Sequence, residues 1–322
     1  MKPIPHPDSM RYKLISILMR DPLKTMAMTR ALRTVGRRTL SAANTVALQA
    51  YLAREASRGL LSTASVRRPR STLRTAMVAH VFYPDLIDEI LACHANMPEG
   101  TALHLTAPQD SAARLAPRIA GRPDIVLKPV ENRGRDIAPF LEVLRSGALD
   151  DCDAVLKIHS KRSPHLGHGD LLRRSMFTAL AGRPDTVGRI LDVMAERPGT
   201  PPAGLVGWRH VFLQHGRHWH TNRGRVSAVS TRLDPPARPD LAFFGGSMFW
   251  FRPAALASIA ALPVVTEDFE VEAGQIDGTL HHALERCFAI AAAAAGYATC
   301  DTHGNVLLSP APGSNPGPRG RR

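Results

Sequence analysis

The sequence predicts an α/β fold in which a mainly parallel sheet carries helices on both faces. Short apolar runs rich in branched residues alternate with helix-like segments of about 10–15 residues, a pattern typical of βαβ units. The hydrophobic fraction of 44% is ordinary for a globular chain and excludes wholesale disorder. Ligands of such sheets bind beyond the carboxyl ends of the strands, so we expect the site there.

The first half of the chain contains four runs that we expect to form buried strands. Three helices are expected between them: one starts at Pro84, where proline suits a first turn, the second spans 109–120, and the third contains Phe140. A later apolar run, 287–298, is expected to form a buried helix. The four predicted strands are 75–82, 102–107, 125–130 and 154–159.

The net charge of +13 is concentrated near the N-terminus. Residues 1–75 hold fifteen Lys/Arg and three acidic residues, whereas the rest hold 26 and 25. We therefore expect a basic arm (1–74) that is partly helical or disordered, a folded body (75–304), and a disordered tail (305–322) rich in Pro, Gly and Arg.

The arm alternates apolar and basic residues over 26–61, as a helix lying on an anionic membrane surface would. The alternative is a solvated extension. Only two aromatic residues, Tyr12 and Tyr51, accompany the positive charge, so we expect no nucleic-acid partner.

The four cysteines, Cys93, Cys152, Cys287 and Cys300, show no C-x-x-C pairing. We expect neither a disulfide framework nor a cysteine zinc site. No apolar run approaches the roughly 20 residues of a spanning helix. The expected location is the cytoplasm, with peripheral contact to the inner face of the plasma membrane through the arm as one option.

Two clusters of charged residues lie at predicted strand ends. After the third strand, a turn at Gly134 before a helix N-terminus favours anion binding, with Asp136 as a helix cap and solvated arginines as the alternative. At the fourth strand, Lys157, His159 and, if the strand continues, Lys161 share one face, which predicts an anionic ligand or an exposed basic edge. The first cluster contains Asn132, Arg133, Gly134, Arg135 and Asp136.

Two further clusters lie in the second half. Aromatic residues gather over 243–253, where Ser247 and Trp250 belong either to a sugar-binding surface or to the core. On a helix, Asp277, His281 and Glu285 would form one stripe and could act as a general base with its partners, unless Asp277 is only a cap. The histidines show no metal-binding spacing, so no metal site is expected.

Five motifs together resemble the rhamnan synthesis protein F family over about residues 78–299, with the arm and tail outside. The resemblance implies a glycosyltransferase or glycosyltransferase-like domain for cell-surface polysaccharide or lipopolysaccharide O-chain assembly. The chain departs from the family pattern at Leu172, where tryptophan is usual, and at Ser247, where threonine is usual. The motifs are HVFYPDLIDEI (80–90), ENRGRDIAPFL (131–141), KIHSKRSPH (157–165), FFGGSMFWFRP (243–253) and GQIDGTLHHALER (274–286).

The layout also resembles GT-A glycosyltransferases, a Rossmann-related class that binds a divalent metal through Asp-x-Asp at a strand end. Here Lys157-x-His159-x-Lys161 stands in that place. We therefore expect no metal and no cofactor, with Lys157, Lys161 and Arg135 stabilising the departing diphosphate. Asn132 and Asp136 are expected near the nucleotide or donor sugar.

The expected reaction is transfer of a deoxyhexose, rhamnose by the family's name, from dTDP-rhamnose to a glycan or lipid-linked glycan. Ser247 and Trp250 are expected near the sugar, and Asp277 is the expected general base, with Glu285 or Glu272 as its replacement. Two alternatives stay open: a non-catalytic glycan- or nucleotide-binding partner, and a membrane or nucleic-acid adaptor driven by the arm.

Overall fold

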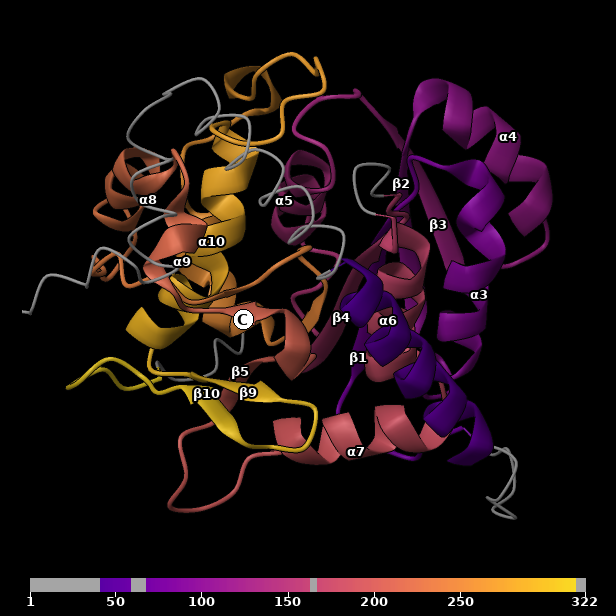
Figure 1. Cartoon of the computed structure of the whole chain (residues 1–322), viewed down its shortest axis with the longest axis horizontal. Coiled ribbons are helices and arrows are strands. Elements are labelled where there is room, and N and C mark those ends of the chain that lie inside the picture. The colour runs from indigo at the N-terminus through magenta and orange to yellow at the C-terminus, as the bar shows by residue number, and fades with distance from the viewer. Residues whose placement is uncertain (1–40, 59–67, 163–166, 317–322) are drawn as a thin grey trace, which may run out of the picture.

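The computed structural model describes residues 41–58, 68–162 and 167–316. An eight-stranded mixed sheet, in the order β10-β9-β5-β8-β4-β1-β2-β3, carries helices on both faces (Figure 1). The predicted α/β class is confirmed, and the fold is Rossmann-like. The strands are β1 Thr75–His80, β2 Ala102–Pro108, β3 Ile125–Val130, β4 Ala154–His159, β5 Ala203–Gly207, β8 Phe249–Phe251, β9 Ala298–Asp301 and β10 Val306–Leu308, with a separate pair β6 Phe212–Leu213 and β7 Phe243–Phe244.

Two helical layers enclose the sheet. Successive side chains of β8 point to different layers. Phe249 and Phe251 pack toward α5 and α10, whereas the Trp250 indole donates a hydrogen bond to Leu180 O of α6 on the other face. The α-helices of the body are α3 Ile87–Ala95, α4 Gln109–Ile119, α5 Ile137–Arg145, α6 Gly169–Ala181, α7 Pro184–Met194, α8 Arg223–Ser230, α9 Ala257–Ala260 and α10 Leu280–Ala294.

The four predicted strands are all present, and β3 and β4 have the predicted bounds. β1 ends at His80, two residues earlier than expected, and the helix expected at Pro84 begins as one 3-10 turn before α3. The prediction of a single helix over 287–298 is wrong at its end. α10 stops at Ala294 because Gly296 turns the chain with φ +85°, and β9 then starts at Ala298.

The ends of the chain contribute more to the fold than the sequence suggested. Residues 41–58 of the predicted arm form a helix in which Leu48 is buried and the Tyr51 ring lies 5.1 Å from that of Trp208. The tail expected from residue 305 includes β10, which pairs with β9. Residues 1–40 and 59–67 of the arm lie outside the described residues.

The strand order reverses between β1 and β4. From β1 the chain moves through β2 to β3 in one direction, and then returns to place β4 on the other side of β1. His80 and His159, the last residues of the two strands, are register partners. A reversal of this kind opens a crevice at the carboxyl ends of the strands, where ligands of α/β sheets bind.

Candidate active site

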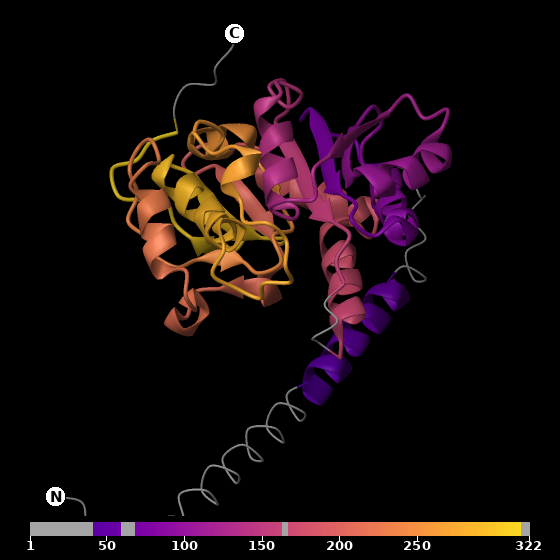
Figure 2. The same ribbon diagram turned by 90° about the horizontal axis from the view of Figure 1, so that it is seen from above.

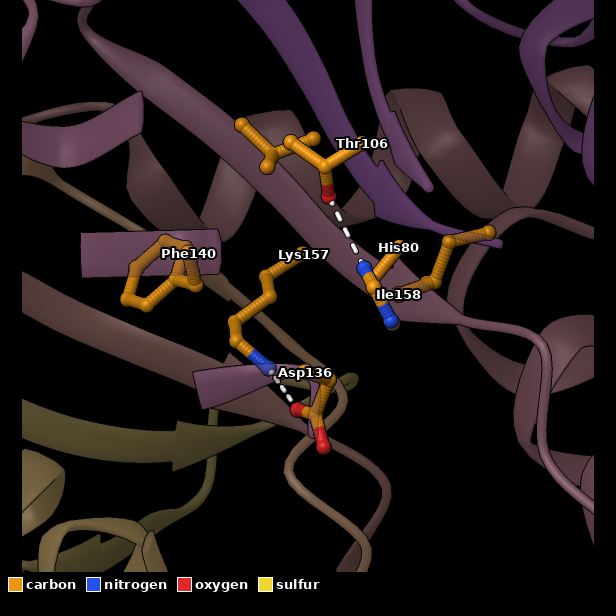
Figure 3. Close-up of a pocket in the computed structure, with 7 residues that line it drawn as sticks. His80, Thr106, Asp136, Phe140, Lys157 and Ile158 are labelled. Carbon is orange, nitrogen blue, oxygen red and sulfur yellow. Dashed lines mark hydrogen bonds and ion pairs between the residues drawn. The ribbon is translucent and has the colours of Figure 1, made fainter. Parts of the chain in front are cut away.

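The candidate site lies at this reversal and is built around the carboxylate of Asp136, just before α5. The Lys157 ammonium lies 2.6 Å from Asp136 Oδ2 (Figure 3). His159 Nδ1 lies 3.2 Å from the same oxygen. Burial alone would raise the pKa of Asp136, but His159 and Lys157 outweigh it and hold that pKa well below its usual range. Asp136 is therefore an ionised carboxylate inside the protein.

Lys157 is buried, and its donors are all used. Besides Asp136, its ammonium bonds the backbone oxygen of Ser247 at 2.7 Å and the Ser247 hydroxyl at 2.9 Å. The rings of Phe140 and Phe249 lie 5.1 and 5.8 Å from Nζ. An ammonium has three donors, so none is left for a ligand. This corrects the expectation that Lys157 faces a diphosphate: here it joins two loops.

The shared face of β4 is confirmed for two of the three predicted residues. Lys157 and His159 both reach Asp136, but β4 ends at His159, so Lys161 follows the strand and is not part of it. Burial lowers the pKa of His159, although Asp136 opposes this effect. At the neighbouring strand end, burial lowers the pKa of His80 to about 4, and its Nδ1 lies 3.0 Å from the Thr106 hydroxyl.

Two tight turns face each other across Lys157. Gly134 (φ +66°) and Arg135 (φ +54°) form one, and Gly246 (φ +93°) and Ser247 (φ +54°) form the other. A Cβ at Gly134 would lie 2.7 Å from the Phe269 ring, so only glycine fits there. A left-handed backbone at non-glycine residues is costly and persists where surrounding contacts hold it.

The arginines of the first turn point toward the segment 267–275. Arg135 donates to both Glu272 carboxylate oxygens at 2.9 and 3.1 Å and to the Gln275 carbonyl oxygen at 2.6 Å. Arg133 donates to the Glu267 carbonyl oxygen at 3.3 Å. Arg135 is thus engaged with a carboxylate instead of an open anion site, and Asn132 is exposed on the turn.

The expectation that Asp277 belongs to a helical stripe is wrong, because α10 begins at Leu280, with Thr279 as its N-cap residue. Asp277 Oδ2 accepts hydrogen bonds from Thr221 N–H and hydroxyl at 3.0 and 2.9 Å, and Oδ1 bonds the Asn222 amide. Arg286 lies 3.5 Å away. Burial would raise the pKa of Asp277, but these donors lower it overall. Its contacts resemble those of a structural carboxylate.

Glu285 has the opposite environment. It accepts a hydrogen bond from Gly246 N–H at 2.8 Å, and burial together with the nearby Asp136 charge raises its pKa despite the Lys161 ammonium close by. Lys161 Nζ lies 3.5 Å from the position that a Cβ on Gly246 would take. Glu285 and Lys161 therefore meet beside the second turn.

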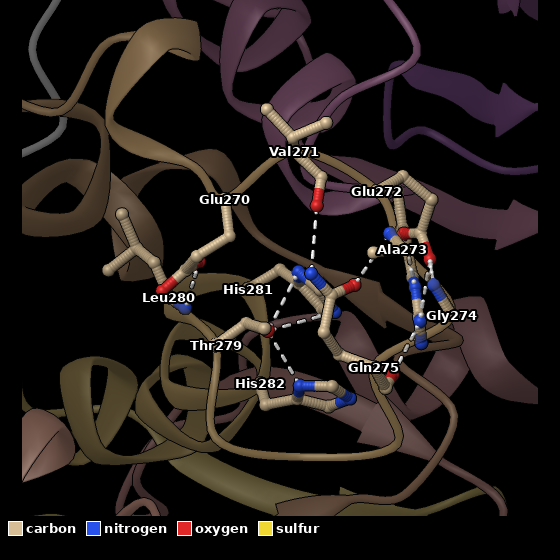
Figure 4. Close-up of polar contacts among 11 residues, drawn as sticks. Glu270, Val271, Glu272, Ala273, Gly274, Gln275, Thr279, Leu280, His281 and His282 are labelled. Atoms are coloured by element: carbon tan, nitrogen blue, oxygen red, sulfur yellow. Dashed lines mark hydrogen bonds and ion pairs between the residues drawn. The ribbon is translucent and has the colours of Figure 1, made fainter.

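His281 lies on the same side of α10, four residues before Glu285. Its Nδ1 is 2.9 Å from the Thr279 hydroxyl, which also lies 2.6 Å from Nδ1 of His282 (Figure 4). Burial and the nearby Arg135 lower the pKa of His281 to about 4. The imidazole is therefore neutral at pH 7.

Trp250, expected near the sugar, lies in the core. It is completely buried on β8 and packs toward α6, away from Lys157. Ser247 does belong to the site through its two contacts with Lys157. Ser247 lies in the turn before β8, beside Lys157, whereas Trp250 lies within β8 and faces the side of the sheet opposite to its neighbours Phe249 and Phe251.

Sequence reasoning missed His80 and Thr106 as members of the site. Both follow the rule that strand ends gather at one edge of a parallel sheet, and His80 begins one of the quoted motifs. Among the described residues, no three His, Cys, Asp or Glu side chains converge to form a metal-binding group. The helices in the described ranges include none with the length and hydropathy to cross a membrane.

The family model of rhamnan synthesis protein F matches residues 44–297. The match begins inside helix 41–58, so the resemblance extends further toward the N-terminus than the motifs indicated. The chain is 31% and 30% identical, over 243 residues, to two proteins named "Uncharacterized protein WxcX" from two strains of Xanthomonas campestris pv. campestris. Each alignment covers 74% of this chain and 34% of the relative, so the chain spans about a third of these curated relatives. The chain belongs to the rhamnan synthesis protein F family, whose name refers to polysaccharide synthesis.

Proposed function

We propose that this chain is a glycosyltransferase that moves a sugar from a nucleotide-sugar donor to a hydroxyl of a growing surface polysaccharide. The observation that carries the proposal is a pair of carboxylates at the strand-order reversal with opposite environments. The pKa of Asp136 is lowered by His159 and Lys157, and that of Glu285 is raised by burial. Divergent pKa values of neighbouring acids are typical of sites that transfer protons.

Glu285 is the general base of this proposal and replaces Asp277, whose oxygens are already occupied by donors. The Glu285 carboxylate takes the proton of the acceptor hydroxyl as the acceptor oxygen bonds the anomeric carbon. The bond from that carbon to the phosphate oxygen breaks, and its electron pair leaves with the nucleoside diphosphate. A base with a raised pKa is well matched to a neutral operating pH.

The leaving diphosphate needs positive charge as its own charge develops. Lys161 is the cation best suited to this role, because it lies beside Glu285 and Gly246, whereas Lys157 is fully bonded. Arg135 would contribute after releasing Glu272. We propose that these side chains act in place of a metal ion. His159 and Lys157 position Asp136.

The donor, acceptor and location complete the proposal. The family name favours rhamnose, hence dTDP-rhamnose as donor, with a glycan or lipid-linked glycan as acceptor. We propose a cytoplasmic site of action, with the basic residues of the arm attracting the chain to the anionic membrane surface.

A second candidate is a non-catalytic glycan- or nucleotide-binding partner in polysaccharide assembly. It is favoured by the tight packing around Lys157, because the pocket between His80, Asp136 and Phe140 has no open space for a reacting sugar. A glycan or nucleotide would then bind elsewhere on the chain. In this role the Lys157–Asp136 pair would only stabilise the fold.

One experiment separates the two functions. Melting curves of the full chain are recorded with dTDP, UDP, GDP or CMP, each with and without EDTA. In separate samples that have not been heated, the release of the free nucleotide from the matching sugar donor is measured with an acceptor glycan. A ligand at 100 times its dissociation constant adds about 2.7 kcal/mol of stability, which a melting curve detects. Nucleotide-selective stabilisation and acceptor-dependent release that Glu285→Gln abolishes would support transfer. Binding without release at any nucleotide would support the binding partner, and activity lost with EDTA and restored by manganese would refute the metal-free mechanism.

A further inference from the structure

A second cavity, of about 260 Å³, lies between helix 41–58 and the body of the protein. Helix 41–58 runs beside α6 (Figure 2), and Ser41 lies 3.4 Å from Nδ1 of His168 at the start of α6. The body contributes residues of α6 and α7 and of the segments that follow β5 and β9. We call it the arm cavity; it is lined by Tyr51, Arg54, Glu55, Arg58, Thr178, Ala179, Thr186, Arg189, Trp208, Arg209, His210, Asp301, Thr302 and His303.

The arm cavity contains more positive than negative charge. Of its four arginines, Arg58 bonds Glu55 at 2.7 Å, and Arg209 lies 3.5 Å from Asp301. The other two, Arg54 and Arg189, have no carboxylate partner within the described residues. Arg189 donates one hydrogen bond, from Nε to the Thr302 carbonyl oxygen. Two guanidinium groups facing one cavity repel each other and favour an anion between them.

One wall of the arm cavity consists of aromatic rings that are tilted against one another. The Tyr51 and Trp208 rings lie 5.1 Å apart, and the His210 ring lies 4.9 Å from that of Trp208. Burial and the nearby Glu55 raise the pKa of Tyr51 to about 12, so its hydroxyl remains protonated and can donate a hydrogen bond. No described residue accepts or donates a hydrogen bond at that hydroxyl.

We propose that the arm cavity binds a sugar bearing a carboxylate or phosphate group. Arg54 and Arg189 bind the anionic group, and the Tyr51 hydroxyl bonds a sugar oxygen. The volume is many times the roughly 10–15 Å³ that a single water molecule requires, so the cavity has room for one substituted sugar ring. This site is separate from the Asp136 site, and its occupancy does not depend on sugar transfer.

The test is isothermal titration calorimetry of the full chain at low ionic strength, with glucose 6-phosphate, glucuronate and neutral glucose as probes. We expect at least one anionic sugar to bind tenfold or more tightly than glucose. Preference for glucose 6-phosphate would identify phosphate as the recognised group, and preference for glucuronate would identify carboxylate.

Variants connect binding to the cavity. Arg54 is exposed, so Arg54→Gln removes charge without removing core packing, and we expect it to weaken binding about tenfold. Arg189→Gln should also weaken binding about tenfold, and Tyr51→Phe should weaken it several-fold. The control is Arg118→Gln, which changes an exposed arginine on α4 outside the cavity and should have no effect on binding. Thermal unfolding verifies that each variant folds. Equal affinity for glucose and both anionic sugars, or unchanged affinity in both cavity arginine variants, would overturn the proposal.

Discussion

The Lys157 ammonium lies 2.6 Å from the Asp136 carboxylate and also bonds the backbone oxygen and hydroxyl of Ser247. One buried side chain therefore holds the turn before α5 against the turn before β8. Both turns contain a non-glycine residue with positive φ, Arg135 in one and Ser247 in the other. The bonds from Lys157 to Asp136 and Ser247 therefore stabilise backbone conformations that each turn alone would avoid.

Removing Lys157 is expected to leave a buried carboxylate without its main partner. Lys157→Met should lower the free energy of unfolding by about 3–5 kcal/mol, because an uncompensated buried charge is strongly destabilising. Urea denaturation at pH 7 measures the change. The double variant Lys157→Met with Asp136→Asn should be more stable than the sum of the two single losses predicts; additive losses would show that the two groups are not coupled. Lys128→Met, which breaks a surface ion pair with Glu142, is the control and should cost at most about 1 kcal/mol.

Stability is expected to fall as pH decreases from 7 toward 4. The folded-state pKa of His80 is about 4, below its ordinary value of about 6.5, so the unfolded chain binds the extra proton first. The stability associated with neutral His80 is therefore complete above pH 6.5 and is lost as pH falls toward 4. Asp136 adds a further loss below about pH 4, because its pKa is also depressed.

Urea denaturation of wild type and His80→Gln at pH 7, 6 and 5 tests this prediction. The stability of His80→Gln should decline less steeply with falling pH, while the exposed control His303→Gln should keep the wild-type slope. Equal slopes in all three proteins would contradict the assignment.

The two candidate bases are expected to respond differently to loss of charge. Glu285→Gln should reduce kcat about 10²–10⁴-fold with little change in fold. Asp277→Asn should reduce stability, because Thr221, Asn222 and Arg286 lose a charged acceptor, and should keep kcat within about tenfold. Release of nucleoside diphosphate measures the rates, and thermal unfolding measures the stabilities.

The pH profile of that reaction provides a second check on the base. Because the Glu285 pKa is raised, kcat/KM should decline on the acid side at a pH above the ordinary glutamate value of about 4.3. A folded Glu285→Gln variant with wild-type turnover would exclude Glu285 and return the role to Asp277 or Glu272.

Glycine is expected to be required at position 134 for two separate reasons. Gly134→Ala would place a side chain on a left-handed backbone, and its Cβ would lie only 2.6–2.7 Å from atoms of Ala138 and Phe269. Gly121 has a similar φ of +76°, but a Cβ there has open space around it, so Gly121→Ala is the matched control. The Gly121 variant should lose about 1–2 kcal/mol, and the Gly134 variant clearly more. Urea denaturation compares them, and equal losses would show that the Phe269 contact relaxes easily.

Residues close in sequence made several parts of the fold predictable. The apolar run of β4, the proline at the start of the first helical turn and the glycine turn before α5 all act over a few neighbouring residues, and their bounds were predicted to within about two residues. The same local patterns predicted that Lys157 and His159 share a face. They also indicated the candidate site at the carboxyl edge, because strand ends in a parallel sheet gather there.

Contacts between distant segments decided the rest. The Lys157 ammonium donates all its hydrogen bonds to Asp136, 21 residues before it, and to Ser247, 90 residues after it. No spacing rule indicates such a pairing. Asp277 lies outside α10, because the helix begins only after Thr279. Its carboxylate oxygens accept hydrogen bonds from Thr221 and Asn222, more than fifty residues earlier in the chain. The sequence by itself determined the fold class, the family and which residue types gather at the sheet edge, since periodicity and motif order are local properties. Only the tertiary structure decided which charged groups are bonded and which are free, because burial and charge pairing depend on segments that folding brings together.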